Sequence, residues 1–334
     1  MAGGMKTRIL VTGSNGLLGN RLVEHLRNRG EVELLATSRG ADRREDRAGY
    51  GYLPLDVTQE DAIQEVFQQF RPDAIIHTAA CTQVEVAEAQ PAECRLLNVG
   101  AVDYLIRACN RWGGHLVFLS TDFVFNGMDG PYSEEDGLSP ISTYGRSKAA
   151  AEKLLRDSGI SWAIVRTILV YGKKVPEGRQ NILHWAEKAL RSGQPIRVVN
   201  DQYRMPTLDE DLAWACTEIA LKRATGVFHI CGPDGVTIHE LVCRVAGHLG
   251  LGTEGIEPVP SRALAHAELR PLRTGFYTRR AQAQLGFVAT SLNQGLAAVL
   301  GPASVTSELK SMDVEPNVPV QPSGFGNAAF NEYV

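Results

Sequence analysis

The chain has 334 residues, enough for one large domain or two modest ones. It is 44% hydrophobic and 22% charged, and its formal charge of −4 argues against an extended nucleic-acid surface. Its apolar runs fall far short of the ~20 residues of a membrane helix, and residues 1–6 lead directly into a predicted strand without a secretory signal, so we expect a cytoplasmic protein.

The first 170 residues alternate short β-rich runs with helical patterns. This alternation predicts a doubly wound parallel sheet of the Rossmann type, covered by helices on both faces. Ligands of such sheets bind at the carboxyl ends of the strands, where the residues that follow the strands should converge. The predicted strands are 8–11, 32–36, 74–77, 115–119 and 162–166, and the predicted helices are 17–29, 59–69, 91–112 and 142–157.

A glycine-rich turn follows the first predicted strand. The spacing Gly-x-x-Gly-x-x-Gly departs by one position from the Gly-x-Gly-x-x-Gly dinucleotide fingerprint. A strand before the turn and a helix after it favour a nucleotide site, because the backbone can approach a pyrophosphate and the first amides of the helix can bind it. The candidate cofactor-binding residues of this turn are Gly13, Asn15, Gly16, Leu17 and Gly19.

The end of the second predicted strand indicates which cofactor is used. An acidic residue there would accept hydrogen bonds from the ribose of NADH, whereas this chain has Ser38 and Arg39. Because a guanidinium matches a phosphate group, we expect NADPH, with NADH as the less favoured cofactor. The alternative interpretation is that Arg39 and the arginines of residues 43–47 belong to a solvated surface loop that happens to be basic and binds no ligand.

Tyr144 and Lys148 lie four residues apart in a predicted helix, so one turn places both side chains on the same face. A neighbouring ammonium favours the phenolate and should lower the tyrosine pKa toward the range useful for acid–base catalysis. Thr121 follows the strand 115–119 and could offer a hydroxyl to the same reacting oxygen. Taken alone, such a pair is more often an ordinary feature of an amphipathic helix.

Several motifs in this order resemble an extended short-chain dehydrogenase/reductase, and a narrower block is similar to the dTDP-4-dehydrorhamnose reductase branch. The superfamily features are the glycine turn, His77 to Ala80, Asn98, Ser120 to Asp122 and the Tyr144–Lys148 pair. The narrower block comprises 120–127, 131–134, Pro140 and 144–148, with later landmarks at 201–207 and 270–271. The resemblance covers roughly residues 6 to 300.

This resemblance implies reduction of the 4-keto group of a nucleotide-linked deoxysugar by NADPH. Tyr144 would be the proton donor, Lys148 would hold the cofactor and lower the tyrosine pKa, and Thr121 would orient the carbonyl. A homodimer is left open, and neither a nucleic acid nor a membrane is an expected partner. Further cofactor-binding candidates are Asp56, Val57, Ala79, Ala80 and Asn98, and the substrate-binding candidates are Thr121, Asp122, Asn181, Arg204 and Arg270.

For two of these candidates a purely structural role is the alternative. Asp56 can be an acid at a helix N-terminus, and Asn98 can be a buried polar residue of its helix. Arg204 and Arg270 are expected near the diphosphate of the substrate, because guanidinium groups suit phosphate oxygens.

Two positions depart from the reductase branch. Its members usually carry a tryptophan where this chain has Ile168 and Leu169, and a glycine with a small residue where it has Arg204 and Met205. Both positions face the sugar in that family, so the substrate is less certain than the reaction type.

Two other functions use the same scaffold. An epimerase or dehydratase is one, although dehydratases typically carry Asp-Glu after the threonine and this chain has Asp122 followed by Phe123. A non-catalytic NADP-binding subunit resembling the methionine adenosyltransferase β subunit is the other.

The six cysteines include no Cys-x-x-Cys pair and no cluster with histidine at zinc spacing. They are expected to be reduced thiols, and no metal site is predicted. Cys81 follows the expected cofactor turn, but a redox role for it is not favoured.

By the same resemblance we expect a discontinuous partition of the chain. Residues 6–170 plus about 201–226 would form the NADP-binding domain, and about 171–200 plus 227–301 a smaller α/β substrate-binding domain. A capping-box spacing of Thr237 and Glu240 predicts a helix over 237–249. Residues 302–334 change to Ser, Val, Pro, Gly and Asn without periodicity, and we expect a poorly ordered tail there.

Overall fold

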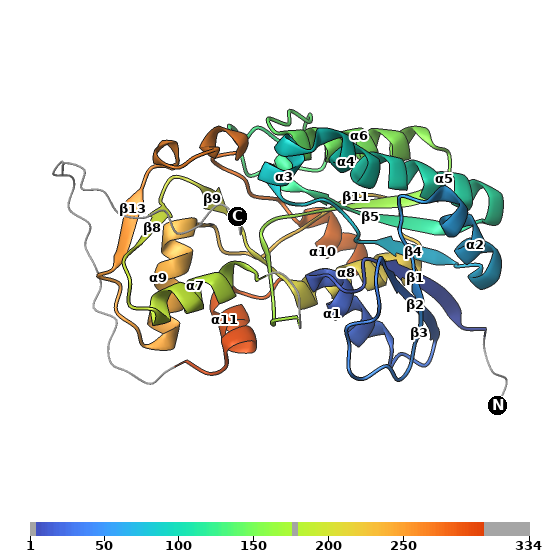
Figure 1. The fold of residues 1–334 in the computed structure, drawn as a ribbon, viewed down its shortest axis with the longest axis horizontal. Helices are drawn as coiled ribbons and strands as arrows, with labels where there is room; N and C mark the ends of the chain where they lie inside the picture. Colours follow the sequence, from blue (N-terminus) through green and yellow to red (C-terminus); the bar gives the residue numbers. More distant parts are fainter. Residues whose placement is uncertain (1–4, 176–179, 304–334) are drawn as a thin grey trace.

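A parallel β-sheet forms the centre of the computed structural model, which describes residues 5–175 and 180–303 (Figure 1). The strand order is β11-β6-β5-β4-β1-β2-β3, and all neighbouring strands run parallel. The five predicted strands are confirmed, and the Rossmann-type fold class with them. The strands are β1 (Thr7–Thr12), β2 (Val32–Ser38), β3 (Gly51–Pro54), β4 (Ala74–His77), β5 (His115–Thr121), β6 (Ser161–Thr167) and β11 (Gly226–Ile230).

Helices cover both faces of this sheet because each presents an apolar stripe to it. One core contains Leu22 and Leu26 of α1 together with apolar residues of α8 and α10. The core on the opposite face joins α2, α5 and α6 to β4 and β5. The helices of the two faces are α1 (Leu17–Leu26), α8 (Asp209–Lys222) and α10 (Arg279–Leu285), and α2 (Glu60–Phe70), α5 (Ala101–Trp112) and α6 (Thr143–Asp157).

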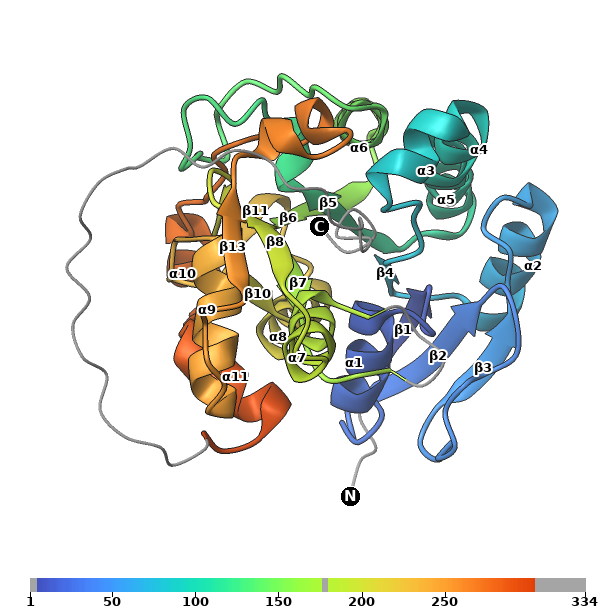
Figure 2. The ribbon, with the colours of Figure 1, turned by 60° about the vertical axis from the view of Figure 1, so that its left-hand side comes forward.

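A smaller group of elements packs around a core of its own beside the sheet (Figures 1 and 2). The parallel pair β8 (Ile196–Val199) and β13 (Ile256–Val259) lies against α7 (Ile182–Arg191) and α9 (Ile238–Leu249). The capping box predicted for Thr237 and Glu240 is present at the start of α9. The remaining members are α11 (Leu292–Leu300) and the short strands β7 (Val170–Tyr171), β9 (Tyr203–Arg204), β10 (Thr207–Leu208) and β12 (Val236–Thr237).

Two features differ from the expectations. The expected boundary placed residues 227–301 in the smaller group, but β11 pairs with β6 at the edge of the central sheet and α10 packs in one of its cores. Conversely, β9 and β10, expected in the NADP-binding domain, pair with β12 and β7 of the smaller group. The helix predicted over 91–112 is interrupted by a π-helical turn, Leu96–Gly100, which carries Asn98. The shorter helices are α3 (Val84–Ala89), α4 (Pro91–Arg95) and the 3₁₀ turns Asp122–Val124, Ser261–Ala263 and Ala267–Leu269.

Two further points concern the whole chain. The expected C-terminal tail lies, from residue 304 on, outside the described residues. Within the described part, no helix is both long and apolar enough to cross a membrane.

Candidate functional site

A cavity of about 760 Å³ lies at the carboxyl ends of the central strands and is bounded on its far side by α7 and the segment after β6. This is the edge where ligands of doubly wound sheets bind. The predicted site residues that line the cavity are Asn15, Gly16, Leu17, Gly19, Ser38, Arg39, Ala80, Thr121, Asp122, Tyr144, Lys148, Asn181 and Arg204.

The glycine turn packs so closely that side chains would not fit at two of its positions. Gly13 has a φ of 72°, and a Cβ atom added to it would lie 2.7 Å from the amide nitrogen of Ala79. A Cβ atom on Gly19 would lie 2.2 Å from the Gly13 carbonyl oxygen. The turn therefore brings bare backbone and the first amides of α1 to the cavity, which is the arrangement that a pyrophosphate needs.

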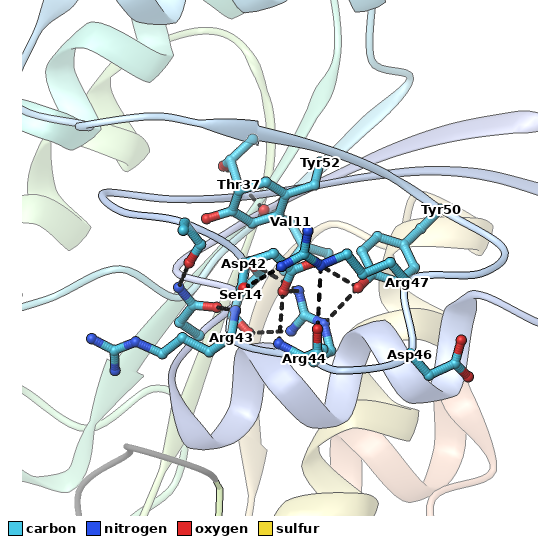
Figure 3. Close-up of polar contacts among 12 residues, drawn as sticks. Val11, Ser14, Thr37, Asp42, Arg43, Arg44, Asp46, Arg47, Tyr50 and Tyr52 are labelled. Carbon is cyan, nitrogen blue, oxygen red and sulfur yellow. Dashed lines mark hydrogen bonds and ion pairs between the residues drawn. The ribbon is translucent and has the colours of Figure 1, made fainter.

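The basic loop after β2 divides into two kinds of arginine (Figure 3). Arg39 and Arg43 are exposed and line the cavity. The side chain of Arg44 is only 8% exposed and contacts Asp42, Tyr50 and the Ser14 carbonyl. The alternative of a solvated basic surface loop is therefore wrong for Arg44, which is buried, and stays open for the exposed arginines.

Of the predicted cofactor-binding residues that follow β3 and β4, only some line the cavity. Ala80 lines the cavity, whereas Ala79 lies behind it against Gly13. Asp56 accepts hydrogen bonds from both the backbone amide and the hydroxyl of Thr58, and Val57 is buried in the core. Neither residue lines the cavity, so their contact with the cofactor stays a prediction.

Asn98 acts at a distance from the cavity. Its side chain forms two hydrogen bonds with the backbone of Cys81, at 2.8 and 2.9 Å, and donates a third to the Ser147 hydroxyl at 2.9 Å. It thus ties the loop after β4 to the residue that precedes Lys148. Asn98 lies in the π-helical turn, which orients its side chain differently from a regular helix over 91–112.

The three predicted catalytic residues meet in the cavity. Tyr144 and Lys148 lie one turn apart on α6, and Thr121 ends β5. A Cβ atom on Gly145 would lie 2.1 Å from the Phe123 carbonyl oxygen, so α6 packs directly on the 3₁₀ turn that follows Thr121. The Lys148 ammonium donates a hydrogen bond to the Leu119 carbonyl at 2.9 Å and lies 4.7 Å from the centre of the Phe118 ring.

Burial dominates the acid–base properties of this trio. It lowers the pKa of Lys148 to about 8, against an opposing effect of Cys94 and Glu152. Burial also raises the pKa of Tyr144, although its hydrogen bond with the Thr121 hydroxyl lowers it. The predicted lowering of the Tyr144 pKa is therefore wrong for these residues, because the loss of hydration outweighs it.

Asp122 and Arg204 form a buried pair at the cavity wall. Asp122 accepts a hydrogen bond from the Thr274 hydroxyl at 2.6 Å, and burial raises its pKa while Arg204 opposes the increase. The guanidinium of Arg204 lies 3.7 Å from Asp122 and donates to the carbonyl oxygens of Tyr203, Pro271 and Leu272. These contacts differ from the expected phosphate contact, since the arginine serves to join β9 to the 271–272 segment.

Asn181 and Arg270 also have structural partners. Asn181 accepts hydrogen bonds from the first amides of α7 and donates to the Gly172 carbonyl at 2.7 Å. Arg270 forms an ion pair with Glu85 of α3 at 2.6 Å and does not line the cavity. A substrate contact for Arg270 stays a prediction that the geometry does not favour.

Sequence reasoning missed a second side of the cavity. Residues 82–85 at the start of α3 line it. Leu169, at one of the positions that depart from the reductase branch, lines it too and has a φ of 39°, whereas Ile168 is buried in a separate apolar cluster. Proximity to the end of β4 could have pointed to residues 82–85.

Glu152 is a further residue that the sequence did not single out. It lies on α6 one turn after Lys148 and forms a bidentate ion pair with Arg166 of β6, at 2.9 and 2.7 Å. It also accepts a hydrogen bond from the Ser120 hydroxyl at 2.6 Å. Both charged side chains are fully buried, so this network fixes α6 against the two strands that end at the cavity.

For metals the result is simple. Among the residues that the structure describes, no group of three or more His, Cys, Asp or Glu side chains is placed to hold a metal ion.

Comparisons with known proteins agree with this geometry. A dTDP-4-keto-6-deoxy-D-glucose reductase of Streptomyces niveus is 34% identical over 275 residues, covering 81% of this chain and 88% of that protein. The methionine adenosyltransferase 2 subunit beta of Rattus norvegicus is 28% identical over 268 residues, covering 78% of each chain.

Solved structures are similar along nearly their whole length. The dTDP-4-dehydrorhamnose reductase of Bacillus anthracis, solved in complex with NADP, has a TM-score of 0.75 and 28% identity, covering 89% of this chain and 99% of that one. The UDP-glucose 4-epimerase of Thermus thermophilus has a TM-score of 0.76 at 23% identity, covering 88% and 99%, which shows the fold alone. The family model described as RmlD substrate binding domain matches residues 7–305. The chain therefore belongs to the RmlD substrate binding domain family.

Proposed function

We propose that this protein is an NADPH-dependent reductase that converts the 4-keto group of a nucleotide-linked deoxysugar, most simply dTDP-4-dehydrorhamnose, to the alcohol. The observation that carries the proposal is the convergence of Thr121, Tyr144 and Lys148 in the cavity that begins at the glycine turn. The reductases of Streptomyces niveus and Bacillus anthracis support the substrate class, and the NADP in the latter structure supports the cofactor.

The cavity suits a dinucleotide phosphate. Glycine at positions 13 and 19 lets the turn pack tightly against the residues after β4 and against itself, and the helix after the turn presents its first amides. Exposed Arg39 lines the cavity, and its guanidinium would contact the 2′-phosphate of the adenosine ribose. A bound NADPH would supply the hydride that reduces the keto carbon.

Three residues of the chain have separate roles in this reaction. Tyr144 donates a proton to the keto oxygen, since a phenol is protonated at neutral pH, the state that a donor requires. Thr121 hydrogen-bonds the same oxygen and fixes its direction. Lys148 contacts the ribose next to the nicotinamide and replaces the Tyr144 proton, since its pKa of about 8 lies close to neutral pH.

A non-catalytic NADP-binding subunit is the second candidate, because subunits of methionine adenosyltransferase are among the similar proteins. Retention of all three catalytic residues in one cavity favours an enzyme. Phe123, which stands where dehydratases carry an acid, disfavours dehydration.

The test is oxidation of NADPH by dTDP-4-dehydrorhamnose, with the product identified by NMR. We expect turnover with the nucleotide-linked sugar, much less with the free keto-sugar, and loss of turnover in Tyr144→Phe. NADP⁺ binding without any turnover would favour the regulatory candidate. Equal turnover of the free sugar would instead redirect the search to small carbonyl compounds.

A further inference from the structure

The loop after β2 is held at four consecutive residues (Figure 3). The Tyr52 hydroxyl donates to the Gly40 carbonyl, and the Asn15 side chain donates to the Ala41 carbonyl at 2.9 Å. The Asp42 carboxylate accepts from the Tyr50 hydroxyl at 2.6 Å, and the Arg43 amide donates to Asn15 at 3.3 Å. Each of these partners lies outside the four residues, so the backbone conformation of the loop is determined by its surroundings.

Arg44 joins this loop to the glycine turn. Its guanidinium donates to the Ser14 carbonyl at 2.7 Å and to the Tyr50 hydroxyl at 3.0 Å, and forms an ion pair with Asp42 at 3.0 Å. Asp42 is itself buried, so the pair is shielded from solvent. These contacts keep Arg44 within the protein and away from any ligand of the cavity.

Arg43 has the opposite orientation. In Figure 3 its side chain points away from Arg44 and Arg47, and it lines the cavity together with Arg39. Arg47 donates to the Asp42 and Arg44 carbonyl oxygens instead. Two of the four arginines of this loop thus line the cavity, Arg44 is buried within the loop, and Arg47 is exposed and does not line the cavity.

We propose that Arg43 and Arg39 together form the binding site for the ribose 2′-phosphate, and that Asp42, Arg44 and Tyr50 are positioning residues that preform it. This inference rests on the proposed function and assigns the cofactor preference to the whole loop rather than to Arg39 alone. A preformed loop binds its ligand without a further loss of backbone entropy, which strengthens the contact that two solvent-exposed guanidinium groups can make.

The first experiment compares Arg43→Ala with Arg47→Ala by calorimetric titration of the full chain with NADP⁺ and NAD⁺. Both substitutions remove one exposed arginine from the same loop, so Arg47→Ala is a charge-matched control. Arg43→Ala should weaken NADP⁺ binding about tenfold, the lower range for a charge-assisted contact at an exposed site, and leave NAD⁺ unchanged. Arg47→Ala should change neither by more than about twofold.

The second experiment tests positioning with Tyr50→Phe, which removes only the hydroxyl that joins Asp42 to Arg44. NADP⁺ affinity should fall about fivefold while NAD⁺ affinity is retained, the loss expected of one hydrogen bond. The positioning role requires a change in the ratio of NADP⁺ affinity to NAD⁺ affinity, because a general loss of structure would weaken the binding of both dinucleotides. Thermal unfolding of the variant is measured alongside.

The outcomes separate this inference from the proposed function. If the wild-type chain binds neither dinucleotide, this inference and the proposed function are both refuted. If it binds NADP⁺ and Arg43→Ala behaves like Arg47→Ala, the proposed function stands and the role of Arg43 is refuted. If Tyr50→Phe weakens NADP⁺ and NAD⁺ equally, or neither, the positioning role is refuted.

Discussion

Lys148 and Glu152 stand one turn apart on the same face of α6, and both are buried, yet their surroundings are opposite. Glu152 has a fully buried arginine and a serine hydroxyl as partners. Lys148 contacts one carbonyl oxygen and the face of a phenylalanine ring, and burial lowers its pKa to about 8.

The difference separates structure from chemistry along a single helix. A buried charge whose partners are complete holds elements together, because removing one member leaves the other uncompensated. A buried charge with incomplete partners costs stability and has a shifted pKa, which is what a proton-transferring residue needs. Glu152 fixes the helix on β5 and β6, and that same helix carries Lys148 and Tyr144 to the end of β5.

The largest effect should come from Glu152→Gln. The substitution leaves Arg166 buried without its countercharge, so the free energy of unfolding should fall by about 3–5 kcal/mol. Urea denaturation measures the loss. The double variant Glu152→Met with Arg166→Met should recover most of it, because apolar replacement of both partners removes the desolvation cost. A loss below about 1 kcal/mol in the single variant would contradict a stabilising role for the pair.

Tyr144→Phe should have the next largest effect, on activity rather than stability. Without the hydroxyl, turnover should fall by at least ~100-fold, equivalent to about 2.7 kcal/mol in the barrier. NADP⁺ affinity, measured by calorimetry, should stay within about twofold, since the proposed role of the hydroxyl is at the keto oxygen of the substrate. Turnover close to wild type would remove Tyr144 from the role of proton donor.

Lys148→Met should stabilise the fold while it impairs catalysis. The folded protein lowers the pKa of Lys148 from its ordinary 10.5 to about 8, so below pH 8 the charged form makes folding less favourable. The gain should be about 1–3 kcal/mol at pH 7, reduced by the lost hydrogen bond to Leu119. Between pH 8 and 10.5 the unfolded chain binds more protons than the folded one, so wild-type stability rises and the gain shrinks. Thermal unfolding of both proteins across this pH range measures the stability difference. A stability gain of Lys148→Met that grows with pH would contradict a lowered Lys148 pKa.

The sequence predicts the sheet and the convergence of Thr121, Tyr144 and Lys148 well, because both depend on short-range patterns. The glycine turn, the strand ends and the spacing of Tyr144 and Lys148 are local, and the parallel sheet then brings them together. What the sequence did not predict depends on contacts between residues that are distant in the chain. Arg204 lines the cavity as expected, but the sequence did not indicate that it donates to the carbonyl oxygens of Pro271 and Leu272, about seventy residues away, and its phosphate contact stays a prediction.

The pKa of Tyr144 belongs to the same class of misses. The spacing to Lys148 indicates a lowered value, but burial depends on the packing of α6 against the turn after Thr121. The division of the basic loop likewise depends on Tyr50 and Ser14, which the arginine pattern does not include.

The smallest effect should come from Lys153→Ala, which provides an exposed counterpart on the same helix. Lys153 and Asp157 form an ion pair at 2.5 Å, but their side chains are 77% and 62% exposed. Water already solvates both charges, so the free energy of unfolding should change by less than about 0.5 kcal/mol, and salt should reduce that further. Urea denaturation at low and high salt measures the change beside Glu152→Gln. If Lys153→Ala cost as much as Glu152→Gln, the stability of α6 would depend on charge number rather than on burial, and the contrast between Glu152 and Lys148 would lose its physical basis.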